Sequence, residues 1–136
     1  MKAMDYYYQI AALFQFKTIC DERGNEYVLL ANNTRNCVEG ISDRTQFEAT
    51  ENHVHLVDCL TKREYSRGAE VAKSIGKALL CSLRSAYPEK QFAVFASLSL
   101  NDSLIIRFHQ KWPNEPLYYS VGDFVSGTET VLKFET

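Results

Sequence analysis

The sequence predicts one α+β domain spanning residues 1–136, with a mostly antiparallel sheet of about six to eight short strands packed on one long helix at about residues 62–87. The chain has 136 residues, 46% hydrophobic content and only three prolines and six glycines, which suits one compact core. Apolar residues recur at helical spacing in one long stretch. Strand-like runs precede and follow that stretch without regular strand–helix alternation, so a doubly wound parallel fold is not expected.

The long helix is predicted from the spacing of its apolar residues. Between residues 62 and 87 they fall three or four apart, while the charged residues Lys73, Lys77 and Arg84 lie mostly on the other side. Pro88 ends the helix, because a proline disfavours helical geometry at the residue before it. The apolar positions are Ala69, Ala72, Ile75, Leu79, Leu83 and Ala86.

Before the helix, residues 10–20 and 27–30 form two β-rich runs around a polar turn that contains Gly24, which is typical of a hairpin. Residues 5–14 also fit helical spacing, so both helix and strand stay open there. A strand is expected within the weakly patterned residues 37–49, and a clearer one at 53–59, where apolar and polar side chains alternate.

After the helix, residues 92–98 and 104–109 are predicted to form a hairpin. They flank Asn101 and Asp102, two residue types that tolerate the positive φ of a tight turn. Two further short strands are expected at 117–121 and 130–134.

Composition excludes some functions. The net charge is −2 and no basic tract is present, so no nucleic-acid partner is expected, and the absence of a long apolar run predicts no membrane partner. The chain does not start like a secretion signal, which favours a cytoplasmic location. Cysteines 20, 37, 59 and 81 form no close pair of the kind found in zinc or redox motifs, so we expect reduced, mostly buried thiols.

No cofactor is expected, because neither a phosphate-binding glycine loop nor a nucleophile motif occurs. His53 and His55 share a strand face and could bind a metal if a third ligand, His109 or Glu51, approached them. This spacing more often gives a half-exposed strand face, so no metal is predicted. The carboxylates of Glu48 and Glu51 have no distinguishing context and are expected at the solvated surface.

Four residues are candidates for a partner-binding surface: Arg107, His109, Trp112 and Glu115. Because strand side chains alternate, burial of Ile106 and Phe108 would turn Arg107 and His109 to the opposite face. Arg and Trp are enriched where proteins bind other proteins. In the alternative interpretation, Trp112 covers the end of the sheet and Arg107 pairs with Glu115.

The segments Arg107-Phe108-His109 and 115–119, together with the long helix before them, resemble small cytoplasmic immunity proteins of contact-dependent and polymorphic toxin systems. The resemblance covers roughly the second half of the chain and specifies no single family, so it assigns no binding residue. It implies a non-enzymatic protein that neutralises a cognate bacterial toxin by occluding it.

Two alternatives to this leading hypothesis stay open. One is a small metal-assisted or ligand-binding enzyme that uses His53, His55 and His109. The other is a structural subunit of a homo-oligomer.

Overall fold

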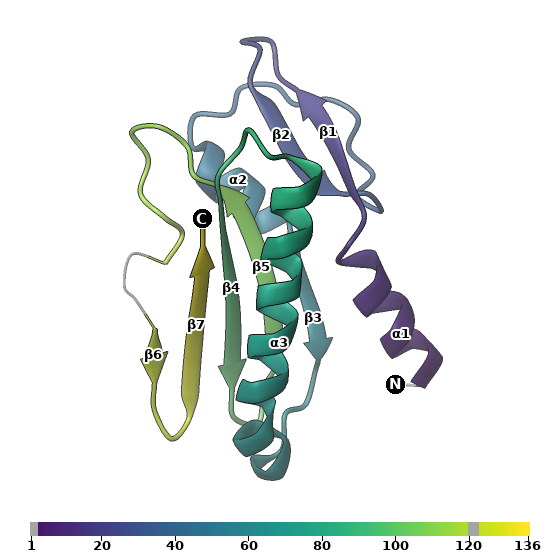
Figure 1. The fold of residues 1–136 in the computed structure, drawn as a ribbon, viewed down its shortest axis with the longest axis vertical. Helices are drawn as coiled ribbons and strands as arrows, with labels where there is room; N and C mark the ends of the chain where they lie inside the picture. The colour runs from purple at the N-terminus through teal and green to yellow at the C-terminus, as the bar shows by residue number, and fades with distance from the viewer. Residues whose placement is uncertain (1–2, 120–122) are drawn as a thin grey trace.

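A computed structural model of the chain describes residues 3–119 and 123–136 and confirms the α+β class. The strands of the larger sheet lie in the order β3-β5-β4-β7-β6 with antiparallel neighbours, and β1 and β2 form a separate hairpin above it (Figure 1). The elements are α1 Ala3–Ala12, β1 Phe16–Cys20, β2 Glu26–Leu30, α2 Arg44–Glu51, β3 His53–Val57, α3 Lys62–Ala86, β4 Phe92–Ser99, β5 Leu104–Gln110, β6 Phe124–Val125 and β7 Glu129–Glu135.

The long helix α3 lies across one face of this sheet, as predicted (Figure 1). It begins with a capping box, in which the Thr61 hydroxyl accepts from the Glu64 amide and the Glu64 carboxylate accepts from the Thr61 amide. A Cβ atom at Gly76 would overlap the ring of Phe134 on β7. Glycine at this position therefore lets the helix approach the sheet closely.

Two hydrophobic clusters meet at the β1–β2 hairpin. Val28 and Leu30 belong to the main cluster between α3 and the sheet. Tyr27 and Leu29, which alternate with them along β2, belong to a smaller cluster that Phe47 of α2 and Trp112 contact. The hairpin is thus buried on both faces along β2, which explains why the whole run from 27 to 30 is apolar or aromatic.

Several expectations before and after α3 need correction or completion. The strand expected within 37–49 is wrong, because α2 begins at Arg44 after Asp43, whose carboxylate accepts from the amide of Gln46 as an N-cap. The open choice at 5–14 is resolved as helix through Ala12. Residues 117–119 form no strand, and residues 120–121 of the same prediction lie outside the described residues.

The predicted burial of the thiols is also wrong. All four cysteines are unpaired and exposed. Cys81 lies on the helix between Leu79 and Leu83, which are completely buried, and a rotation of about 100° per residue turns it away from the sheet. The small, weakly polar side chain of cysteine therefore did not predict whether these residues are buried.

Exposure predicts that all four thiols of the native protein react with a water-soluble disulfide reagent. Titration without denaturant should release about four equivalents of the reporter thiolate, and adding denaturant should release little more. Four thiols that react only after unfolding would contradict the exposed positions of the cysteines.

Candidate functional site

The face of the sheet opposite α3 is covered by α2 and by the segment 111–119 that follows β5. Arg107 and His109 project from β5 toward this side, as the alternation predicted. The face is not free, however. It carries a network of buried polar groups centred on Glu48 of α2.

Glu48 has an exposed fraction of 0%, so its expected place at the solvated surface is wrong. Its Oε1 accepts from the amide of Gln110 at 2.8 Å and from the Trp112 indole at 2.7 Å. Its Oε2 accepts from the amide of Val28 at 2.9 Å and from the Gln110 side chain at 2.8 Å. One carboxylate therefore joins α2 to β2, β5 and the segment after β5.

Asn52 extends this junction one helical turn further along. Its side-chain Nδ2 donates to the carbonyl of Val28 at 2.8 Å, and its side-chain Oδ1 accepts from the backbone amide of Leu30 at 3.1 Å. With Glu48, it satisfies three backbone groups along the edge of β2 that another strand would otherwise pair. The side chains of Glu48 in α2 and of Asn52, which caps the C-terminus of that helix, thus take the place of a neighbouring strand for β2.

The protonation of Glu48 is set by two opposing effects. Burial raises the pKa of the Glu48 carboxyl to about 7, while the hydrogen bonds from Gln110, Val28 and Trp112 act to lower it. All four partner groups are N–H donors, so they favour the carboxylate and offer no acceptor for a proton. The carboxylate therefore connects segments of the fold through all four of these hydrogen bonds.

Glu115, a candidate partner-binding residue, holds the start of α2. Its Oε1 accepts from the amide of Thr45 at 2.7 Å and its Oε2 accepts from Nε of Arg44 at 2.7 Å. Although burial acts to raise it, the pKa of Glu115 is lowered because Arg44 and Thr45 donate to the carboxylate. Arg44 also lies over the ring of Trp112, 4.7 Å from its centroid. The alternative pairing of Arg107 with Glu115 is therefore wrong, since Arg44 occupies that position.

His109 and Arg107 also make hydrogen bonds to other groups of the fold. His109 Nε2 accepts from the amide of Tyr118 at 3.1 Å, so Nδ1 carries the hydrogen and donates to the Gln110 carbonyl at 2.7 Å. Burial lowers the pKa of His109, which favours the neutral ring. Arg107 donates to the Ala49 carbonyl at 3.0 Å, and its guanidinium carbon lies 4.4 Å from the centroid of the Tyr118 ring.

The predicted partner-binding surface changes accordingly. His109 has an exposed fraction of 0%, so its assignment to a contact surface is corrected. Arg107, Trp112 and Glu115 are partly exposed, and each makes a hydrogen bond within the fold, although Nε of Arg107 is buried without a partner in the described part of the chain. Partner binding by these three residues stays a prediction.

The metal-site alternative receives no third ligand from the described residues. The rings of His53 and His55 lie 5.4 Å apart on one face of β3, as expected. His109 is occupied by Gln110 and Tyr118. In residues 3–119 and 123–136, no group of three or more His, Cys, Asp or Glu side chains is placed to hold a metal ion.

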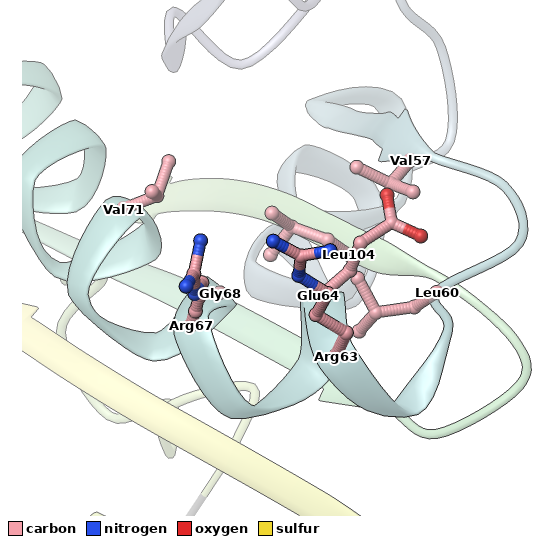
Figure 2. A pocket seen from close by; sticks show the side chains of 8 residues that line it. All are labelled: Val57, Leu60, Arg63, Glu64, Arg67, Gly68, Val71 and Leu104. Carbon is pink, nitrogen blue, oxygen red and sulfur yellow. The ribbon is translucent and has the colours of Figure 1, made fainter.

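An open groove that the sequence did not predict lies on the α3 side of the molecule, where the first turns of α3 pass the ends of β3 and β5 (Figure 2). Its volume is about 360 Å³. The charged side chains of its lining, Arg63, Glu64 and Arg67, are exposed. The lining residues are Val57, Leu60, Arg63, Glu64, Arg67, Gly68, Val71 and Leu104.

The spacing of Arg63, Arg67 and Val71 was the one sequence signal for this groove. These residues follow each other at intervals of four, which places them on one side of a helix. The opposite wall comes from other segments, since Val57 of β3 and Leu104 of β5 are register partners. That wall could not be predicted from sequence spacing, because its residues are distant in the chain.

No protein-family model, curated protein or solved structure matches this chain. No helix in the described part of the chain is both long and apolar enough to cross a membrane.

The hydrogen bonds of Glu48 predict that replacing it with glutamine, which has nearly the same shape, lowers the stability of the protein strongly. In Glu48→Gln the side-chain NH₂ group must face two of the four N–H donors, which leaves buried donors unsatisfied, and we expect a loss of about 2–4 kcal/mol in the free energy of unfolding. Glu70→Gln, at an exposed position on α3, should change it by less than about 0.5 kcal/mol. Chemical denaturation measures both, and equal stabilities of the two variants would contradict the role of Glu48.

His109 predicts a pH dependence of stability. The folded ring has a pKa below the ordinary 6.5, so below about pH 6.5 the unfolded chain binds a proton that the folded chain does not. The wild type should therefore lose stability relative to His109→Gln as the pH falls from 8 to 5. Glu48 titrates in both proteins, so its contribution to the pH dependence largely cancels in the difference between their stabilities. A stability difference that stays constant over this range would refute the prediction.

Proposed function

We propose that this chain is a non-enzymatic protein-binding module that neutralises a cognate bacterial toxin by occluding it. The observation that carries the proposal is the open groove beside α3, whose lining combines apolar side chains with those of Arg63 and Arg67. Apolar anchors bordered by arginine are the usual chemistry of protein interfaces. Val71, with an exposed fraction of 54%, continues the apolar surface outward from the groove.

The polar residues that could have served catalysis support the same proposal. Glu48 and His109 are completely buried and bonded to groups of the fold itself. Their interactions hold α2 and the segment 111–119 in place. We therefore assign them a structural role in a binding protein.

The toxin-neutralising part of the proposal draws on the resemblance to immunity proteins. An occluding inhibitor binds tightly when its surface is already formed, because little ordering entropy is then lost on binding. The groove meets this requirement, since its walls belong to α3, β3 and β5. The proposal thus predicts a tight one-to-one complex with little rearrangement of this chain.

Co-expression tests this function directly. The protein encoded immediately beside this gene should arrest bacterial growth when expressed alone, and co-expression of this chain should restore growth and give a one-to-one complex on size-exclusion chromatography. Continued arrest without a complex would refute the proposed function. Self-association of this chain without a complex would favour the homo-oligomer alternative.

Matched variants then locate the contact surface. Val71→Asp should weaken the complex at least tenfold, which corresponds to about 1.4 kcal/mol. Val125→Asp makes the same change at a position on β6 with an exposed fraction of 71%, and should leave affinity unchanged. Arg107→Ala tests the surface predicted from sequence. A loss of affinity in Arg107→Ala but not in Val71→Asp would place the interface on the α2 side instead.

A further inference from the structure

We infer that the groove beside α3 binds an acidic, amphipathic segment of the partner protein, with carboxylates paired to Arg63 and Arg67 and an apolar side chain between its walls. This inference deepens the proposed function and rests on it, because it names the chemistry of the partner at the same site. It also predicts binding to a simple peptide, which can be measured without the partner.

The groove has one charged wall and one apolar wall. Arg63, Arg67 and Val71 come from successive turns of α3, and Figure 2 shows them along the same side of the helix. Val57 and Leu104 form the other wall. A ligand that fills the groove must therefore present apolar and anionic groups together.

A glycine in the groove lining lets α3 approach the sheet closely. Gly68 directly follows Arg67, and a Cβ atom there would stand only 2.8 Å from Cδ2 of Leu98. The helix is therefore close to the sheet at this turn. Leu60, which is almost completely buried, contributes apolar lining at the base.

Neither arginine of the groove is bonded to a carboxylate in the described part of the chain. Glu64, the acidic residue of the lining, accepts from the amide and hydroxyl of Thr61 at 3.2 and 2.7 Å, and these hydrogen bonds hold its pKa below the ordinary value. Neither Arg63 nor Arg67 forms an ion pair within residues 3–119 and 123–136. The lining thus carries two arginines and one ionised glutamate, so it stays cationic by one charge, and both guanidiniums are available to an external anion.

The size and openness of the groove favour a protein segment over a small ligand. About 360 Å³ lies near the lower end of the range of about 300–1,000 Å³ for small-molecule pockets. The exposed rim would leave a small molecule largely in water. A longer segment can instead insert one anchor and continue along α3, where carboxylates one helical turn apart match the spacing of Arg63 and Arg67.

A peptide titration followed by nuclear magnetic resonance tests the inference. The probe is a 15-residue N-acetylated helical peptide with two glutamates four positions apart flanking leucine and phenylalanine, and its charge-reversed copy carries lysines instead. The acidic peptide should shift the amide signals of residues 57–71 and of Leu104. The lysine peptide should not, and added salt should weaken the acidic complex.

Charge reversal on the same helix supplies the matched control. Arg63→Glu with Arg67→Glu should weaken binding of the acidic peptide at least tenfold. Lys73→Glu with Lys77→Glu makes the same charge change, four residues apart, at exposed positions outside the groove and should leave binding unchanged. Acidic residues near the N-terminus of α3 are compatible with its dipole, so the first variant should fold.

Each outcome decides the inference. The inference is overturned if the acidic peptide leaves the amide signals of the groove residues unshifted, or if the two double variants weaken its binding equally. Sodium decanoate serves as a small amphipathic anion, and shifts with this molecule but not with the peptide would overturn the inference as well. If the toxin complex forms while the acidic peptide fails, the inference is wrong and the proposed function stands. If the peptide binds with the expected charge dependence while no toxin complex forms, the groove chemistry stands and the proposed function fails.

Discussion

A buried carboxylate with four N–H partners holds α2 against β2, β5 and the segment that carries Trp112. The β1–β2 hairpin is not part of the five-stranded sheet, so no strand ladder attaches it there. Glu48 and Asn52 replace that ladder with side-chain hydrogen bonds. Burying a charge is costly unless all its bonding capacity is used, and here that requirement fixes the placement of three segments at once.

The parts predicted from sequence are those set by local pattern. The helix 62–87 and the hairpin around Asn101, whose φ is 65°, follow from spacing and turn chemistry and are confirmed. The role of Glu48 could not be predicted, because its partners at 28, 110 and 112 are distant in sequence. The helix α2 was missed for a related reason, since it is short and its buried residues are Thr45, Glu48 and Ala49, which give no apolar stripe at helical spacing.

The face of β5 that carries Arg107 and the groove beside α3 show the same limit of prediction from local sequence patterns. Alternation correctly turned Arg107 and His109 away from the α3 face, but it does not reveal that α2 and the segment 111–119 cover them on the other side. The spacing of Arg63 and Arg67 was visible in the sequence, whereas the apolar wall opposite them is assembled from β3 and β5. A pattern in one segment therefore gives the direction of a side chain, and the opposing segment decides whether it forms a core or a site.

Native-state hydrogen exchange tests the central claim that Glu48 and Asn52 attach β2 to the rest of the molecule. The amides of Val28 and Leu30, which donate to these two side chains, should be protected about as strongly as the amides of β4 and β5. Strong protection of β4 and β5 with rapid exchange at Val28 and Leu30 would show that the hairpin detaches easily, and would contradict this account.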